Sequence, residues 1–182
     1  HSNLIPWQYA ARVSGAKLRY LYTDREGRLP ASEIEEKITP ATKLVAVGHI
    51  SNVTGVINPV EQIIRRAHSV GARVLVDGTQ AVPHIPVDVM ALDADFYVFS
   101  SHKMLGPGGV GILYGKHELL DSMPPFLFGG DMIEYVEEQS ATFAPLPQKF
   151  EAGTLDVGGA VGLAAAIDYL KAIGMDSIEA KE

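Results

Sequence analysis

Hydrophobic and polar positions along the chain follow two periods, which predict helices and strands in turn. Helical spacing indicates helices over residues 4–14, 31–38, 59–69, 87–92, 117–122 and 158–173. Pro6 suits the first turn of the first of these helices, and Gly71 ends the helix over residues 59–69. Short apolar or alternating runs indicate strands over residues 17–22, 44–47, 73–77, 95–99 and 110–114. Residues 51–58 are predicted to form a loop, and the proline-rich residues 124–149 are predicted to be irregular.

The alternation of strands with helices favours an α/β fold with a mainly parallel sheet sandwiched by helices. Small residues dominate positions 158–173, so this helix is expected to pack closely against the sheet. No internal repeat, low-complexity segment or linker interrupts the 182 residues, which suffice for one domain core.

The composition is that of an ordinary soluble globular protein, with 47% hydrophobic and 20% charged residues. A net charge of −7 without a basic patch argues against binding to nucleic acid or to an anionic membrane. The first residues lack the basic and apolar regions of a signal peptide, so a cytoplasmic location is expected. The chain contains no cysteine, which excludes disulfides and thiolate metal sites within it.

One stretch, Ser-Ser-His-Lys-Met-Leu-Gly-Pro-Gly-Gly at residues 100–109, carries the most unusual chemistry. It places Lys103 between two apolar runs, although lysines usually stay in water. A lysine at the end of a core strand can act as a nucleophile toward aldehydes. The lysine precedes the glycines and a strand follows them, so this is neither an NTPase phosphate loop nor a dinucleotide fingerprint. Taken alone, Lys103 also fits a solvated turn lysine.

A second stretch gives Lys103 a chemical partner. Residues 73–80 form an apolar strand that ends in Asp77, and the carboxyl end of such a strand is where ligands bind in open α/β sheets. A Schiff-base lysine, together with a carboxylate that pairs with a pyridinium nitrogen, is the requirement of a pyridoxal 5′-phosphate (PLP) site. Asp77 alternatively fits the N-cap of a following helix.

Four segments together resemble the class V aminotransferase family. They are Ser-Asn-Val-Thr-Gly (51–55), Val-Asp-Gly-Thr-Gln-Ala-Val-Pro-His (76–84), Phe-Ser-Ser-His-Lys-Met-Leu-Gly-Pro (99–107) and Phe-Glu-Ala-Gly-Thr (150–154). The resemblance covers essentially the whole chain, and within the family it is strongest to the SufS-type cysteine desulfurases and the related selenocysteine lyases. It implies that residues 1–182 are the PLP-binding large domain of a fold-type I enzyme, with the family's N-terminal segment and C-terminal small domain absent.

The same resemblance implies a role for each cofactor-binding residue. Lys103 would be the catalytic residue, binding PLP covalently and moving protons on the substrate. Asp77 would pair with the pyridine nitrogen, and Gln80 would reach the phenolic oxygen of the ring. Ser100 and His102 would contact the phosphate group.

Further roles follow for residues outside those two stretches. Asn52 would bind the substrate carboxylate, and Thr154 would reach the phosphate of the partner subunit in a homodimer. Leu155 and Asp156 depart from the proline-containing continuation expected after Thr154. Ser101 is expected to be a spacer. His1 aligns beside the family's ring-stacking histidine and is not assigned that role. The remaining histidines lack metal-ligand spacing and are expected to be structural: His49, His68, His84 and His117.

The activity implied by the resemblance is that of a PLP-dependent cysteine desulfurase. Such an enzyme releases alanine from L-cysteine and passes sulfur as a persulfide to a sulfur-acceptor protein for iron–sulfur cluster assembly. Because this chain has no cysteine to carry the persulfide, it is expected to be the cofactor domain and to be inactive in isolation.

Other functions stay open at this point. The fold also suits a selenocysteine lyase, a cysteine sulfinate desulfinase, or another class V lyase, aminotransferase or epimerase; the opening residues 2–8 favour the desulfurase and selenocysteine lyase group. A non-catalytic scaffold is a further alternative, against which the joint presence of Asp77, Gln80, His102 and Lys103 argues. A metal hydrolase lacks the required ligand spacing.

Overall fold

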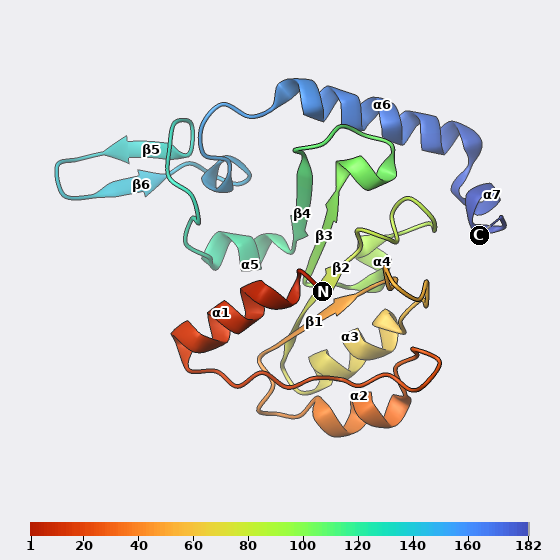
Figure 1. Cartoon of the computed structure of the whole chain (residues 1–182). Coiled ribbons are helices and arrows are strands. Elements are labelled where there is room, and N and C mark those ends of the chain that lie inside the picture. The colour runs from red at the N-terminus through yellow and green to blue at the C-terminus, as the bar shows by residue number, and fades with distance from the viewer. Residues whose placement is uncertain (182) are drawn as a thin grey trace.

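A computed structural model describes residues 1–181, and a four-stranded sheet lies at its centre (Figure 1). The strands are β1 (Leu44–Gly48), β2 (Arg73–Asp77), β3 (Phe96–Ser100) and β4 (Gly111–Gly115), in this order across the sheet. β1, β2 and β3 run parallel, and β4 is antiparallel to β3. The predicted α/β fold with a mainly parallel sheet is therefore confirmed.

The main core forms between this sheet and helix α3 (Val60–Ser69), which connects β1 to β2 (Figure 1). The apolar positions of α3 recur every three or four residues and are buried: Val60, Ile63, Ile64 and Ala67. They belong to the same buried cluster as the inward-facing residues of the strands: Val45, Val74, Val76 and Tyr97. Burial of these side chains holds the helix on the sheet.

The other helices largely agree with the predicted ones. They are α1 (Leu4–Ser14), α2 (Ala31–Lys37), α4 (Val89–Leu92), α5 (His117–Ser122), α6 (Val157–Ile173) and α7 (Met175–Glu179). α7 was not predicted, and neither were the short 3₁₀ helices η1 (Ser101–Met104) and η2 (Gln148–Phe150). Within the described residues, no helix is long and apolar enough to cross a bilayer.

The strand predicted over residues 17–22 is wrong. This segment pairs with no strand and is instead tied to α2 by side chains. The Tyr22 N–H donates to Glu33 at 2.8 Å, and the Lys37 amine donates to the Tyr20 carbonyl at 2.9 Å. Its alternating pattern therefore reflects an extended chain lying against one helix.

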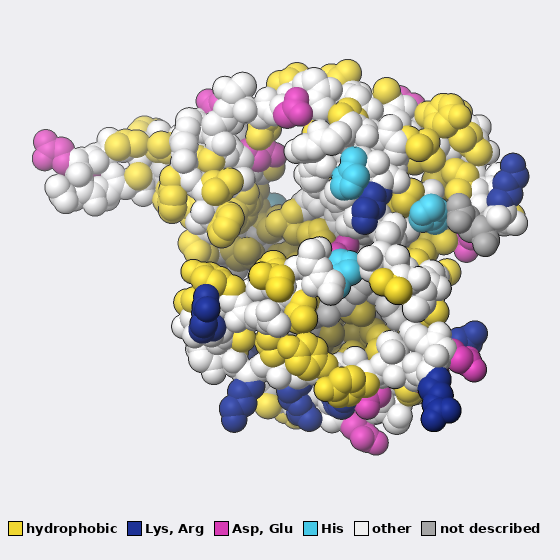
Figure 2. Space-filling view, viewed as in Figure 1, with side chains coloured by type: hydrophobic (Ala, Val, Ile, Leu, Met, Phe, Trp, Pro, Cys, Tyr) yellow, Lys and Arg dark blue, Asp and Glu magenta, His cyan; other side chains and the backbone are white. Residues whose placement is uncertain are grey.

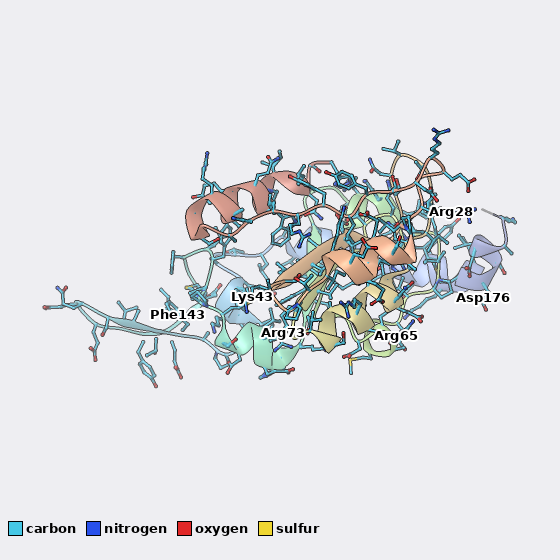
Figure 3. The ribbon with its side chains drawn as sticks, turned by 90° about the horizontal axis from the view of Figure 1, so that it is seen from below. Arg28, Lys43, Arg65, Arg73, Phe143 and Asp176 are labelled. Atoms are coloured by element: carbon cyan, nitrogen blue, oxygen red, sulfur yellow. The ribbon has the colours of Figure 1, made fainter. Side chains whose placement is uncertain are left out.

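The prediction of irregular structure over residues 124–149 is also wrong in part. β5 (Ile133–Val136) and β6 (Ala141–Phe143) form an antiparallel hairpin that projects away from the body of the molecule (Figure 1, and Figure 3 with Phe143 labelled). Every residue of β5 is exposed. The hairpin therefore has no buried face to produce an alternating apolar pattern.

Helix α6 crosses the top of the sheet beside η1 (Figure 1). A Cβ at Gly159 would come within 2.4 Å of the Val110 side chain, and one at Gly162 within 2.4 Å of Pro107. A second apolar cluster forms here from Met104, Leu163 and Leu170. The small residues do permit close packing, as predicted, but their partner is the connection between β3 and β4 rather than the face of the sheet.

A buried carboxylate holds the amino-terminal edge of the sheet. Asp95 is 0% exposed and accepts a hydrogen bond from the Val74 N–H at 2.8 Å. It also lies 2.8 Å from His68 and 3.4 Å from both Arg73 and Lys116. Figure 3 shows Arg73 at this edge, near Lys43. Asp95 therefore joins β2 to α3 and to the segment that follows β4.

Candidate functional site

The carboxyl ends of the three parallel strands meet at one edge, and most of the predicted site residues lie there. Asp77 ends β2 and Ser100 ends β3. Asn52 is exposed in the loop that follows β1. This edge is also the usual ligand-binding edge of a parallel α/β sheet. The topology thus brings together residues from three separate sequence stretches.

The backbone at Asp77 is fixed on both sides. Beyond β1, the His49 N–H donates to the Asp77 carbonyl at 2.8 Å. On the other side, the Gly78 N–H donates to the Val98 carbonyl at 2.8 Å. The ladder therefore continues past the end of β2, and the side chain of Asp77 leaves a backbone that both neighbouring strands hold.

The Asp77 carboxylate, on a half-buried residue, has two hydrogen-bond donors. Its Oδ2 accepts from the Asn3 side-chain amide at 2.9 Å, and its Oδ1 accepts from the Thr79 N–H at 3.1 Å. Thr79 lies in a turn, and no α-helix begins directly after β2, so the alternative that Asp77 caps a helix is wrong. Each oxygen keeps a lone pair for a further donor.

A glycine lets the chain turn closely after Asp77. A Cβ at Gly78 would lie 2.1 Å from the hydroxyl oxygen of Tyr97, whose ring fills the space beneath this position. The Gly78 carbonyl accepts from Ala81 at 2.8 Å and from Val82 at 3.0 Å. Gln80 is half-buried in this turn, close in sequence to Asp77.

A buried histidine–tyrosine pair lies under the same strand ends. His49 Nδ1 is 2.9 Å from the Tyr97 hydroxyl. Burial lowers the pKa of His49, with the charge of Glu61 acting in the opposite direction. Burial, and then the negative charge of Asp77, raise the pKa of Tyr97 far above its usual range. His49 therefore supports the strand that carries Asp77, through its backbone bond to the Asp77 carbonyl and its contact with Tyr97.

Lys103 lies on η1, directly after β3, together with His102. Both side chains are exposed, so Lys103 is not buried between strands. Within residues 1–181, the side chains of Lys103 and His102 make no hydrogen bond or ion pair. On the face shown in Figure 2, histidine and basic side chains lie near an acidic one around a central hollow.

The turn after η1 is packed tightly around Ser101. Leu105 has a φ of 67°, and the Gly106 N–H donates to the Ser101 carbonyl at 3.1 Å. A Cβ at Gly106 would lie 2.1 Å from the Ser101 Oγ. That hydroxyl is buried and has no hydrogen-bond partner within the described residues. Ser101 thus points into the protein, whereas its neighbours His102 and Lys103 are exposed.

Thr154 is not at the carboxyl edge of the sheet. It is exposed in the segment between η2 and α6. The preceding Gly153 has a φ of 82° and donates its N–H to the Gly130 carbonyl at 2.9 Å. This ties the segment to the start of the β5–β6 region. The structure therefore brings Asp77, Gln80, Ser100, His102 and Lys103 to one edge and leaves Thr154 elsewhere.

The remaining histidines have separate surroundings. His68 contacts Asp93 and Asp95 at the amino-terminal edge, and His1 Nδ1 accepts from the Asn3 N–H at 3.1 Å. Among residues 1–181, no group of three or more His, Cys, Asp or Glu side chains is arranged to hold a metal ion.

Sequence reasoning missed four residues around Asp77: Asn3, Trp7, His49 and Tyr97. The His49–Tyr97 contact depends on the register of three strands, which no local pattern encodes. Asn3 and Trp7 are four residues apart at the start of a helix, and this spacing is a usable signal for a side-chain contact. Their link to Asp77, 74 residues from Asn3, carries no such signal.

The residues at this edge offer a carboxylate acceptor, an amine without a partner among residues 1–181, an imidazole and a hydroxyl. This set suits a ligand with a protonated ring nitrogen at one end and an anionic group at the other. The amine could form a covalent bond to a carbonyl carbon of such a ligand.

Comparison with known proteins gives a consistent picture. A profile of the family described as Aminotransferase class-V matches residues 1–182. The chain is 57% identical to a probable cysteine desulfurase of Streptomyces coelicolor and 51% identical to a cysteine desulfurase of Dickeya dadantii. Both alignments cover 100% of this chain and 44% of the relative.

Two solved structures have the same fold. The cysteine desulfurase CsdA from Escherichia coli superposes with a TM-score of 0.92 at 44% identity, covering 97% of this chain and 44% of that one. The apo cysteine desulfurase of Thermococcus onnurineus NA1 superposes with a TM-score of 0.94 at 45% identity, covering 98% and 45%. The chain thus spans less than half the length of these relatives.

Proposed function

The chain belongs to the class V aminotransferase family, and from this premise we propose that it is the PLP-binding large domain of a cysteine desulfurase. One observation carries the proposal: Asp77, oriented by two donors, and Lys103, whose amine has no partner in the described residues, lie at the same edge of the sheet. Relatives named cysteine desulfurase, such as those at 57% and 51% identity, support this reaction over others of the family.

The donor set at this edge fits PLP. Asp77 would accept a hydrogen bond from the pyridine nitrogen, because both its oxygens keep a free lone pair. Lys103 Nζ would bind the aldehyde carbon. Ser100 and His102 would hold the phosphate, and Gln80 would reach the phenolic oxygen. The site needs no rearrangement of an existing ion pair, since Lys103 makes none within residues 1–181.

When bound, PLP supplies an electron sink for the α-carbon of an amino acid. Asp77 orients the ring and keeps a negative charge beside its nitrogen. Asn52 binds the substrate carboxylate. Lys103 Nζ accepts the α-proton of L-cysteine and later returns a proton as alanine forms. The sulfur passes to a cysteine thiol, and since the 182 residues contain none, that thiol lies outside them.

The proposal extends to the assembly and the setting of the enzyme. The exposure of Thr154, away from the carboxyl edge of its own sheet, supports a homodimer in which Thr154 contacts the phosphate bound to the partner subunit. The persulfide would be handed to a sulfur-acceptor protein for iron–sulfur cluster assembly in the cytoplasm.

Borohydride reduction of the full-length protein incubated with PLP, followed by peptide mass mapping, tests the cofactor assignment. A phosphopyridoxyl adduct is expected on Lys103, and Lys103→Ala should abolish it. Lys43→Ala, at the opposite edge of the sheet, serves as the control and should keep the adduct. An adduct that persists in Lys103→Ala would overturn the assignment.

The substrate is tested by measuring alanine release from L-cysteine, L-selenocysteine and cysteine sulfinate. A cysteine desulfurase releases alanine from cysteine and forms a protein persulfide. Release confined to selenocysteine or to the sulfinate would replace the proposed reaction with that of a lyase or a desulfinase. The 182-residue chain alone should release sulfide from cysteine no faster than free PLP does.

A further inference from the structure

One hydrogen-bond donor to the Asp77 carboxylate comes from a residue that is distant in the sequence. Thr79, which donates to Oδ1, lies two residues away, and this contact belongs to the local turn. Asn3, which donates to Oδ2 at 2.9 Å, lies 74 residues away and precedes α1. The start of the chain therefore determines how one carboxylate oxygen is held.

Trp7 fixes the orientation of the Asn3 amide. Its indole N–H donates to Asn3 Oδ1 at 3.2 Å. An indole nitrogen can only donate, so it must face the amide oxygen, and the amide NH₂ is left to face Asp77. Asn3 and Trp7 are four residues apart, which places them on one side of the first turn of α1. Trp7 therefore donates to Asn3, and Asn3 in turn donates to Asp77.

Asn3 makes these contacts at the expense of its usual local role. It occupies the N-cap position of α1, where an asparagine oxygen normally accepts a hydrogen bond from a backbone N–H of the first turn. Its side chain makes no such capping bond. The amide is therefore committed to Trp7 and Asp77 rather than to its own helix.

We propose that Asn3, oriented by Trp7, is a positioning residue that sets the plane of the Asp77 carboxylate for the ring nitrogen of the bound cofactor. This inference rests on the proposed function. With Oδ2 held by Asn3 and Oδ1 held by Thr79, the carboxylate cannot rotate without losing both contacts. Its remaining lone pairs are then directed before the cofactor arrives, which lowers the cost of ordering the site.

Substitutions at Asn3 can separate positioning from simple anchoring of α1. Serine is also a good N-cap, but its hydroxyl lies one bond closer to the backbone and withdraws from Asp77. Aspartate keeps the size and the capping preference of asparagine but turns a donor toward Asp77 into a second carboxylate. Trp7→Phe keeps an aromatic ring and removes the N–H that orients Asn3, together with part of the ring volume. Gln8→Ala is the control, on an exposed residue of the same helix.

The experiment measures PLP affinity, the visible circular dichroism of the bound cofactor, kcat and KM in the full-length protein, alongside thermal unfolding. For Asn3→Ser we expect roughly a tenfold loss of PLP affinity, the size of one hydrogen bond to a charged group, and a changed dichroic band. Trp7→Phe should change the band in the same direction, and Asn3→Asp should weaken PLP binding further. For Asn3→Ser, kcat should fall and KM for cysteine should stay, because Asn3 does not contact the substrate.

The two proposals fail in different ways. If the wild-type protein forms no adduct at Lys103, the proposed function fails. If it does, and both Asn3→Ser and Asn3→Asp keep the wild-type dichroic band and PLP affinity, the positioning role is overturned. A lower unfolding temperature with an unchanged cofactor signal would likewise overturn it, since Asn3 would then serve only to anchor α1.

Discussion

At the scale of single residues, the site depends on a glycine, whose lack of a side chain allows a close contact. Gly78 follows Asp77 and lies over the Tyr97 ring, which leaves no room for a Cβ. The Tyr97 hydroxyl is in turn 2.9 Å from His49. The close contact between Gly78 and the buried Tyr97 ring therefore helps to fix the backbone at Asp77. The local sequence does not predict this contact.

Gly78→Ala is expected to lower the free energy of unfolding by about 3 kcal/mol, the upper range for overpacking a core. The new methyl group would lie within about 2.1 Å of Tyr97 ring atoms, so either the ring or the turn must move. Urea denaturation measures the effect. Gly108→Ala is the matched control, because a Cβ there meets nothing within 4 Å. Equal stability of the two variants would contradict the packing described here.

Ser101→Ala should stabilise the protein by about 1 kcal/mol. The Ser101 hydroxyl is buried and has no partner in the part of the chain that the structure describes, and a buried polar group left unpaired carries a desolvation cost. The comparison is made by urea denaturation in the absence of PLP. Ser122→Ala, which removes an exposed hydroxyl bonded to the Leu119 carbonyl at 2.8 Å, should change stability by less than about 0.5 kcal/mol. A destabilised Ser101→Ala variant would show that the hydroxyl has a partner.

At the scale of elements, Asp95 binds the amino ends of the sheet together. Burial acts to raise the pKa of Asp95, but hydrogen bonds from His68 and Val74, and the charges of His68 and Lys116, outweigh it and keep the pKa below its usual value. The carboxylate is therefore a buried charge with its partners in place. Such groups cost most when one partner is removed.

Asp95→Asn is expected to cost about 3 kcal/mol in the free energy of unfolding, because it leaves buried donors and the Lys116 charge without their carboxylate. Denaturation of this variant is compared with that of Asp93→Asn. Asp93 is largely exposed, although it contacts the same His68 and Lys116, and exposed ion pairs contribute at most about 1 kcal/mol. A similar cost for both variants would argue against a special role for the buried carboxylate.

The sequence predicts the elements of the main core well and misses some that carry no apolar pattern. α3 and β2 carry apolar positions at the helical and strand periods, and the structure confirms both. The β5–β6 hairpin is exposed along β5, so nothing in its pattern required a strand. Residues 17–22 alternate without a neighbouring strand, and the pattern alone cannot supply the partner.

The candidate site also contains residues that the sequence predicts and residues that it does not. The positions of Asp77, Ser100 and Lys103 at strand ends follow from motifs that are contiguous in sequence. The contacts of Asn3 and His49 follow from the placement of α1 and from the strand register, which are properties of the folded chain. Local sequence therefore predicts the residues of the candidate site better than the residues that hold them in place.

At the scale of the whole molecule, the stability of the fold should fall in two separate ranges of acidic pH. Burial lowers the pKa of His49, so the unfolded chain takes up a proton near the usual value of 6.5 while the folded chain does not. The free energy of unfolding should therefore keep its full value above pH 6.5 and begin to fall below that pH. For Asp95, stability is present above its usual value of 3.8 and should fall further below it.

Urea denaturation measured at a series of pH values checks both ranges. His49→Gln should remove the fall that begins below pH 6.5 and leave the lower one. Asp95→Asn should keep the fall that begins below pH 6.5 and remove the one that begins below pH 3.8. A profile in wild type that stays flat until pH 3.8 would contradict the account of His49.

The contact between Asn3 and Asp77 has a consequence for the order of events during synthesis. The two residues are 74 positions apart, and a ribosome adds roughly 5–20 residues per second. For about 4 to 15 s, Asn3 and Trp7 therefore exist on the nascent chain before Asp77 does. Lys103 follows later still, so the candidate site is completed only after the chain has been extended past β3. A cofactor could bind covalently to the nascent chain only after that point.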